Sequence, residues 1–331
     1  MTKIASDRRP THLAAMLALF VLSAAGSTAQ AADKVVFTSA INVPFAPNII
    51  AVDQGFAKKH GLDAEYKIFE AGGMSVEAVV TRNAQVAICA DLCLMIQRAK
   101  GGRFALVART SYTGTELGIG VRAPVQKPAD LVGKKIGYFK VSPGEQFFEL
   151  YFKKHGLDPK GATLVHIAPP EWIPALARGD IDAFFGWEPW LTKLPTAVPG
   201  AHVLARSGDN NVYTMEFGLV MDQAFLAERP AVAERALAAV KDAIDFINAQ
   251  PKAAAQIVAK AYRISPTDAE NYMRNNTYVL DLKKTFVDRQ RSMAQWVDEH
   301  KIARIPDIDA LVREYVDPRV IKKVAPGSTD F

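Results

Sequence analysis

A six-residue sequence, KKHGLD, occurs twice in this chain of 331 residues, at positions 58–63 and 153–158. A second pair of similar segments, RNAQVA at 82–87 and RGDIDA at 178–183, has almost the same separation, 96 residues compared with 95. The shared separation predicts two lobes built to a common plan. The alternative is chance similarity between helix ends, where basic residues and glycine are common.

Each half of this repeat contains the same order of strands and helices. A short apolar strand comes first, followed by a helix that ends in KKHG, a second strand, another helix and a third strand. Alternating strands and helices predict an α/β fold with parallel-rich sheets flanked by helices. The expected strands are 34–38, 64–69 and 84–90 in the first half, and 135–139, 162–167 and 181–186 in the second.

Two strand-rich segments connect the lobes, and we expect crossings near residues 119–124 and 214–220. The predicted organisation is a first lobe at 32–121, a second lobe at 122–216, and a return to the first lobe with C-terminal helices at 217–331. Two crossings define a hinge. Ligands prefer clefts at domain interfaces, and in open α/β sheets they lie beyond the carboxyl ends of the strands. The loops after the repeated strands are therefore the predicted site.

The first 31 residues have the pattern of a secretory signal peptide. A basic start precedes the apolar run 13–25, and Ala29-Gln30-Ala31 is a small-x-small cleavage site. The run is shorter than the ~20 apolar residues that a membrane-spanning helix needs, so an uncleaved anchor is the weaker alternative. No cysteine follows the site, which argues against a lipid anchor. We expect an exported protein that is cleaved after Ala31.

The charge balance excludes nucleic acid as a partner. The net charge is +5, and it falls to +3 without the first 31 residues, which hold three basic residues and one acid. This excess is small, and no basic stripe with interleaved aromatic residues occurs in the chain.

Cysteine and histidine give no metal or cofactor site. The only cysteines, Cys89 and Cys93, are either two small buried apolar side chains or a disulfide, whose geometry over this spacing is demanding. None of the six histidines lies at metal-ligand spacing. We therefore predict no metal and no cofactor.

Two sequence motifs of the second half carry a family resemblance. LVGKKIG at 131–137 is similar to the pattern L-x-G-K-x-I-(G/A), and LARGDID at 176–182 precedes the aromatic-acid-proline segment GWEPW at 186–190. In this order they resemble the periplasmic substrate-binding proteins of ABC importers, in the branch that serves nitrate, sulfonates, taurine and thiamine-pyrimidine precursors. Further matching segments are PxxP at 44–47, GF at 55–56, GG at 72–73 and the strand before Asp91.

The resemblance, which spans roughly residues 33–320, implies a two-lobe periplasmic-binding-protein fold with a ligand cleft between the lobes. It implies a monomeric periplasmic receptor that captures a small solute, closes, and presents it to a permease in the inner membrane. One rival is a pyrimidine-synthase-like enzyme on the same fold, and another is a structural periplasmic partner. Neither a G-x-S-x-G nor an H-E-x-x-H motif occurs, and we predict no enzyme activity.

The candidate binding residues follow the predicted strands or lie near the crossings. Trp187 could stack on a planar ligand, and Glu188 could accept a hydrogen bond from an amino group. Ser142 and Glu145 could form a capping box at a helix start that attracts an anion, although Glu145 would compete for the same donors. Arg109 could bind an anionic headgroup through a bidentate contact, or form an ion pair within the protein. For the other candidates, a structural role in the core or in a helix cap is the alternative. The full set is Asn42, Phe45, Asn48, Gly73, Ser75, Asp91, Thr113, Tyr138, Ser142, Gly144, Glu145, Trp187, Glu188 and Glu216.

The aromatic residues and acids of this set disfavour a small bare anion. An organic solute with an apolar or planar body is the better match. Within the solutes that the resemblance implies, we favour an organosulfonate such as taurine. A heteroaromatic solute similar to a thiamine precursor is the second possibility.

Overall fold

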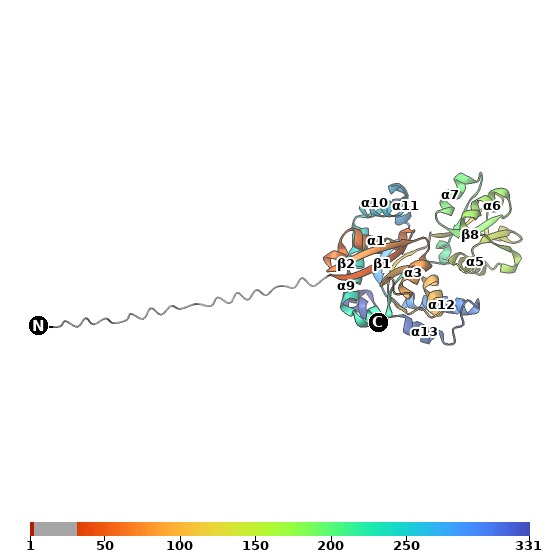
Figure 1. Ribbon diagram of the computed structural model, residues 1–331. Helices are drawn as coiled ribbons and strands as arrows, with labels where there is room; N and C mark the ends of the chain where they lie inside the picture. The colour runs from red at the N-terminus through yellow and green to blue at the C-terminus, as the bar shows by residue number, and fades with distance from the viewer. Residues whose placement is uncertain (3–31) are drawn as a thin grey trace. The chain divides into compact units, whose positions relative to one another are not determined.

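The computed structural model of the protein describes residues 1–2 and 32–331, so the predicted signal sequence and its cleavage site lie outside the described residues. Residues 32–331 form two α/β lobes, each built on its own β-sheet (Figure 1). None of the helices in this part of the chain is both long enough and apolar enough to cross a membrane.

The first sheet has six strands in the order β11-β4-β10-β3-β1-β2. Strand β1 runs parallel to β2 and β3, whereas β10 runs antiparallel to both β3 and β4. The strands are β1 (Asp33–Ala40), β2 (Leu62–Phe69), β3 (Val86–Ala90), β4 (Phe104–Thr113), β10 (Met215–Asp222) and β11 (Thr277–Asp281).

The second sheet has five strands in the order β7-β6-β8-β5-β9. Strand β6 runs parallel to β7 and β8, and β5 runs antiparallel to β8 and β9. Both sheets are therefore mixed, not dominated by parallel pairs, because the strands next to the crossings reverse direction. The two-lobe α/β prediction is confirmed. The strands are β5 (Leu117–Val121), β6 (Lys135–Tyr138), β7 (Thr163–His166), β8 (Ala183–Trp187) and β9 (His202–Arg206).

The repeated sequence has a structural counterpart. The order β2-β1-β3 in the first sheet matches β7-β6-β8 in the second, with the same parallel pairings. The two KKHG segments lie at the ends of helices α2 and α5. Their glycines, Gly61 and Gly156, have φ angles of +71° and +65°. Glycine reaches this left-handed conformation without a steric penalty, which explains why the helix ends share a sequence.

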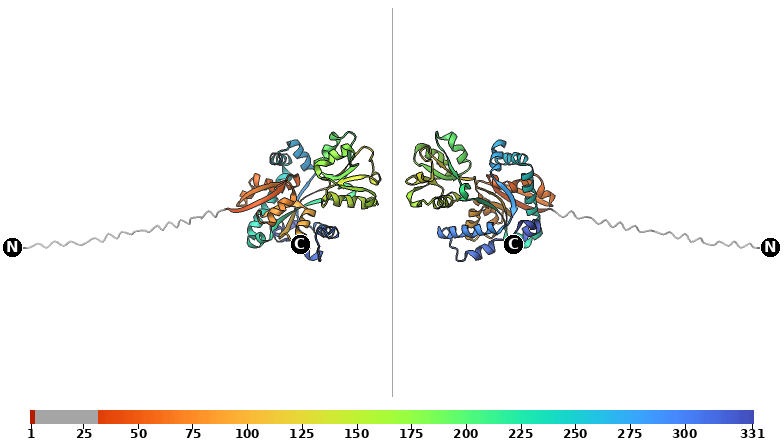
Figure 2. Two further views of the ribbon diagram at one scale, coloured as in Figure 1. Left: turned by 45° about the vertical axis from the view of Figure 1, so that its right-hand side comes forward. Right: turned by 180° about the vertical axis from the view of Figure 1, so that it is seen from behind.

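Helices cover both sheets, and the long α9 begins at Pro230. Those after β10 pack on the first lobe: α9 on α1 and α12 on α4. In the three views of Figures 1 and 2, α5, α6 and α7 stay with the second sheet. The helices are α1 (Ala46–Asp53), α2 (Phe56–Lys59), α3 (Gly72–Val80), α4 (Asp91–Ala99), α5 (Pro143–Lys154), α6 (Trp172–Arg178), α7 (Trp190–Ala197), α8 (Gln223–Glu228), α9 (Pro230–Ala249), α10 (Pro251–Tyr262), α11 (Pro266–Arg274), α12 (Lys284–Glu299), α13 (Ile308–Tyr315) and α14 (Arg319–Val324).

The chain crosses between the sheets earlier than predicted at both points. It leaves the first sheet after Thr113 and joins the second at Leu117, so residues 117–121 belong to the second lobe and not to the first. It returns between Arg206 and Met215. The first crossing was predicted too late in the chain because β4 and β5 are both apolar in sequence and only three residues separate them.

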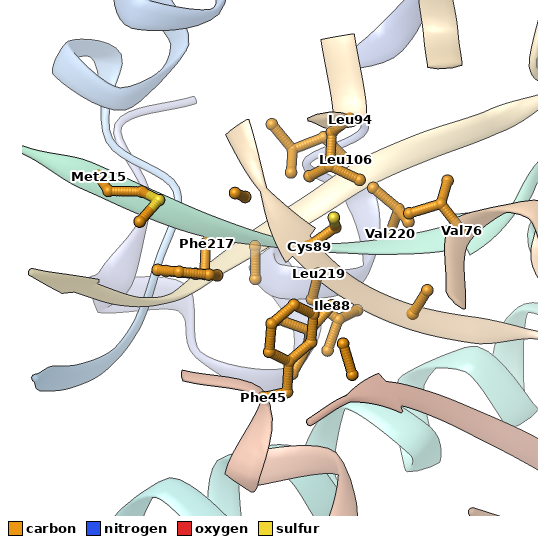
Figure 3. Packing of buried hydrophobic residues seen from close by; sticks show 14 of the residues in the cluster. Phe45, Val76, Ile88, Cys89, Leu94, Leu106, Met215, Phe217, Leu219 and Val220 are labelled. Carbon is orange, nitrogen blue, oxygen red and sulfur yellow. The ribbon is translucent and has the colours of Figure 1, made fainter. Parts of the chain in front are cut away.

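A continuous apolar core fills the first lobe (Figure 3) and extends into the second, where it includes Phe147 and Phe185. All five residues of β3 are buried, and Phe45 packs on Phe217 with ring centroids 5.7 Å apart. Cys89 lies in this core, and both cysteines are free thiols, so the disulfide alternative is wrong. A separate core in the second lobe is centred on Trp172, which stacks on Phe184.

Candidate functional site

The carboxyl ends of the parallel strands in both sheets lie beside the two crossings. Trp187, the last residue of β8, pairs with Leu117, the first residue of β5. Ala90, the last residue of β3, pairs with Phe217 near the start of β10. Only residues 114–116 separate β4 from β5, and such a segment spans at most about 14 Å. The strand ends of the two lobes therefore face each other across a short distance.

The two crossings touch each other through backbone atoms. The N–H of Gly208 donates a hydrogen bond to the carbonyl of Gly114 at 2.7 Å, and the hydroxyl of Ser207 donates to the same carbonyl at 3.1 Å. A Cβ atom added to Gly114 would lie 2.8 Å from the Cα of Gly208. Only glycine permits this approach, and the sequence analysis missed both residues because it placed the crossings elsewhere.

Large apolar side chains are exposed at the strand ends of both lobes. We call Ile41, Met74, Phe139 and Val141 the apolar rim; they are 55%, 51%, 37% and 38% exposed. Their common place at the carboxyl ends of strands makes them candidates for contact with a ligand. Val141 has a φ of +56°, a strained conformation for a β-branched residue and one that is concentrated at functional sites.

Aromatic rings line the second lobe behind this rim. Phe139 lies 5.3 Å from the ring of His166 and 6.4 Å from that of Trp187, measured between centroids. Tyr138 meets His166 edge to face. Trp187 is half-buried, and its ring is perpendicular to that of Trp172 at 4.8 Å. The predicted stacking residue is thus anchored on the core of its lobe and also takes part in the aromatic wall.

A polar group of four residues, which we call the crossing cluster, joins both lobes to the first crossing. Asn42 follows β1 and donates to Oε1 of Glu116 at 2.8 Å. The N–H of Glu188 donates to the carbonyl of Glu116 at 3.1 Å, and Arg206 pairs with the Glu188 carboxylate at 2.7 Å. Burial raises the pKa of Glu116 to about 7, against the opposing effect of the Asn42 hydrogen bond.

Glu188 is less available to a ligand than the sequence indicated. One carboxylate oxygen pairs with Arg206, and the other accepts the N–H of Thr192 at 3.0 Å. Both oxygens are therefore committed within the second lobe, whereas Glu116, which the sequence analysis did not select, has a free oxygen.

Two further predicted acids are held inside the first lobe. Oδ1 of Asp91 accepts the N–H of Leu92 at 2.8 Å and the hydroxyl of Tyr213 at 3.3 Å. Burial, with repulsion from Glu216, raises the pKa of Asp91 to about 7. Glu216 pairs with Arg109, as the ion-pair alternative for this arginine predicted, and with Arg289.

Four other predicted residues have structural roles. Phe45 belongs to the apolar core, and Asn48 is fully buried and donates to the carbonyl of Thr38 at 2.8 Å. Ser75 donates to the carbonyl of Gly72 at 2.8 Å, and Thr113 donates to that of Asn275 at the same distance. These side chains are at most 4% exposed, so packing and internal hydrogen bonds account for them, and their contact with a ligand stays a prediction. Their position next to the strand ends was the signal, but burial cannot be read from position alone.

The start of α5 has the predicted cap in a modified form. The hydroxyl of Ser142 accepts the N–H of Glu145 at 3.3 Å, but the Glu145 carboxylate accepts the N–H of Val141 and not that of Ser142. Burial raises the pKa of Glu145. Gly144 is buried against the second sheet, while Gly73 is partly exposed in the first turn of α3.

A groove of about 570 Å³ lies between α5 of the second lobe and α12 of the first. At its edge, the indole N–H of Trp296 donates to Glu149 at 2.7 Å, and Nε2 of His300 lies 2.7 Å from the same carboxylate. Nδ1 of His300 faces the carbonyl of Trp296 at 2.8 Å. Both ring nitrogens face acceptors, which favours the protonated imidazole. Across residues 32–331, no three histidine, cysteine or acidic side chains are grouped as metal ligands.

Comparison with known proteins gives consistent matches. A protein of Brucella abortus (strain 2308), named as a binding protein, is 26% identical over 251 residues, which are 75% of this chain and 77% of that protein. The taurine-binding periplasmic protein of Escherichia coli (strain K12) is 27% identical over 175 residues, 53% of this chain and 55% of its own. The crystal structure of the periplasmic aliphatic sulphonate binding protein SsuA from Escherichia coli has a TM-score of 0.74 at 16% identity, covering 86% of this chain and 92% of that one.

The likeness to SsuA shows a shared fold, that of a periplasmic binding protein. The resemblance that the two motifs of the second half indicated is confirmed by a family profile described as NMT1/THI5 like, which matches residues 42–254. This match includes both crossings and more than half of the chain, and the protein therefore belongs to the NMT1/THI5-like family.

Proposed function

We propose that the protein is a periplasmic receptor, which binds a small organic solute between its lobes and delivers it to the permease of an ABC importer. The observation that carries this proposal is the apolar rim, contributed by strand ends of both lobes that face each other across two short crossings. Solute binding would shift an equilibrium between lobe arrangements toward the one that it contacts on both sides. No chemical step is needed.

We propose an organosulfonate, taurine-like, as the solute class. Relatives named for taurine and for aliphatic sulfonates support this choice, and the apolar rim suits a short alkyl chain. The start of α3 suits the anionic group, since it has no side-chain cap and no acid in its first turn. By contrast, α4 and α5 each have an acid in their first turns, Asp91 and Glu145.

A heteroaromatic solute is the second candidate, and the ring group around Phe139 and Trp187 favours it. Stacking on these rings would suit a planar body. Both candidates use the same cleft, so a direct comparison of ligands separates them.

The test is a thermal-shift screen of the exported chain with taurine, alkanesulfonates, nitrate and pyrimidines, with mass spectrometry of the solute afterwards. A receptor is stabilised by its solute, by about 2.7 kcal/mol at a concentration of 100 Kd, and leaves it unchanged. A response to pyrimidines alone would replace the sulfonate proposal. Conversion of the solute would indicate an enzyme, and no response to any of these compounds would refute the receptor proposal for them.

A further inference from the structure

Glu116 has an oxygen without a partner in a buried position. Its side chain is 5% exposed, and Oε1 accepts the hydrogen bond from Asn42. Oε2 accepts no hydrogen bond from any described residue, yet it is not among the fully enclosed unpaired atoms, so it retains access to solvent. A group that donates a hydrogen bond can therefore reach Oε2 without displacing a protein partner.

The charge of Glu116 is compensated only in part: burial raises its pKa to about 7, and the attraction of Arg206 offsets this only partly. Arg206 is the cation of the crossing cluster, and it is occupied by the Glu188 carboxylate and the carbonyl of Thr115 at 2.8 Å. Asn42 supplies a neutral donor only. Burial raises the pKa of Tyr272, and repulsion from Asp268, Glu188 and Glu116 adds to this. Among the described residues, Glu116 therefore has a cation nearby but none paired with its carboxylate.

Glu116 also lies where a solute would touch both lobes. It stands on the first crossing, with Asn42 of the first lobe bound to its side chain and the backbone of Glu188 of the second lobe bound to its carbonyl. A group that binds Oε2 is thus held at the junction on which lobe movement depends. An ammonium group suits this position, because it donates hydrogen bonds and its positive charge favours the ionised form of Glu116.

We propose that Glu116 accepts a protonated amino group of the solute and so selects amino-bearing sulfonates over simple alkanesulfonates. This inference rests on the proposed function and names the residue that determines specificity within that solute class. The sulfonate end then lies toward the first lobe, where the start of α3 carries no acid. The apolar rim covers the carbon chain between the two charges.

The experiment compares two ligands that differ by the amino group. Taurine and ethanesulfonate are titrated calorimetrically into the wild-type protein and into Glu116→Gln. We expect the wild type to bind taurine at least about tenfold more tightly than ethanesulfonate. The variant keeps an acceptor for Asn42 but loses the charge, so its affinity for taurine falls roughly 10- to 100-fold. Its affinity for ethanesulfonate stays within about twofold of the wild type.

A matched control removes a charge elsewhere. Glu228 is exposed at the end of α8, which follows β10 at the edge of the first sheet opposite the crossings. Eight residues of β10 separate these edges, about 23 Å, more than twice the Debye length in physiological salt. Glu228→Gln should therefore bind both ligands as the wild type does. Circular dichroism and thermal unfolding show whether each variant is folded.

Each outcome decides the inference. Equal losses for both ligands in folded Glu116→Gln would give this residue a structural role at the crossing and overturn the selectivity. Equal binding of taurine and ethanesulfonate by the wild type would also overturn it while leaving the sulfonate proposal in place. Binding of neither ligand by the wild type would refute the proposed solute class, and the inference with it.

Discussion

The contact between Gly114 and Gly208 predicts that a single methyl group alters the hinge. In Gly208→Ala the new Cβ would lie 2.9 Å from the Cα of Gly114 and 3.0 Å from its carbonyl oxygen. Real Cβ atoms do not approach backbone atoms so closely. Because the obstacle is backbone and not a flexible side chain, the two crossings must separate for the variant to fold.

Overpacking in other proteins lowers the free energy of unfolding by about 1–3 kcal/mol, and we expect a loss in this range for Gly208→Ala. The entropy of unfolding is about 2.1 cal/mol/K per residue, so the 300 residues of 32–331 give about 0.6 kcal/mol/K. A cost of about 2 kcal/mol therefore lowers Tm by roughly 3 °C. Gly114→Ala should have a similar effect, and the double variant should cost less than the sum, because both methyl groups fill the same gap.

The assay combines calorimetric unfolding with small-angle X-ray scattering and titration with the solute. We expect Gly208→Ala to change the scattering profile and the affinity several-fold, although it adds no group to the cleft. Gly327→Ala is the control, since its Cβ meets nothing within 4 Å and its φ is not left-handed. If Gly208→Ala matched this control in Tm, scattering and affinity, the hinge assignment would be refuted.

Three further substitutions test other parts of the site. Burial raises the pKa of Asp91 to about 7, so the folded protein binds more protons than the unfolded chain from about pH 4 to 7 and loses stability as pH rises through this window. Asp91→Asn should reduce that loss by at most about 4 kcal/mol; urea unfolding at pH 5 and 8 measures it, and an unchanged slope contradicts the assignment. Burial lowers the pKa of His300, but the hydrogen bond to Glu149 and that to the Trp296 carbonyl raise it above its ordinary value. Glu149→Gln should lower it, as NMR titration of the imidazole would show; no change would mean that the contact between α5 and α12 does not form in solution. Trp187→Ala should weaken solute binding about tenfold or more while Trp187→Phe retains most of it, and equal affinities by calorimetry would remove Trp187 from the cleft wall.

The fold was largely predictable because its signals are local and repeated. KKHGLD marks two helix ends that need the same left-handed glycine, and the apolar segments before and after it are the strands of each sheet. The order β2-β1-β3 and its counterpart β7-β6-β8 then follow from one common plan. The position of the first crossing did not follow, since β4 and β5 are both apolar and only residues 114–116 separate them.

The sequence predicts where a candidate site lies, but not which contacts its side chains make. Loops after parallel strands lead to the cleft, which is why Asn42 and Trp187 were selected. Whether a loop side chain faces the cleft or the core depends on packing between distant segments, and Asn48 illustrates this with its bond to the carbonyl of Thr38. Glu116 was missed for the same reason: its partner, Asn42, is distant in sequence, and its position became a crossing only when the sheets were known.

The common plan of the two lobes also accounts for an asymmetry of charge across the cleft. Equivalent strands end in equivalent helix starts, but acids occupy them unequally. In the second lobe, the helix starts after β6 and β7 carry Glu145 and Glu171, and Glu188 binds the N–H of Thr192 after β8. In the first lobe, α1 and α3 have no acid in their first turns, and the acid of α4, Asp91, is buried. Acids therefore occur at these helix starts of the second lobe, whereas α1 and α3 of the first lobe have none and the acid of α4 is buried. For a solute bound between these strand ends, this distribution favours one orientation of opposite charges at its two ends.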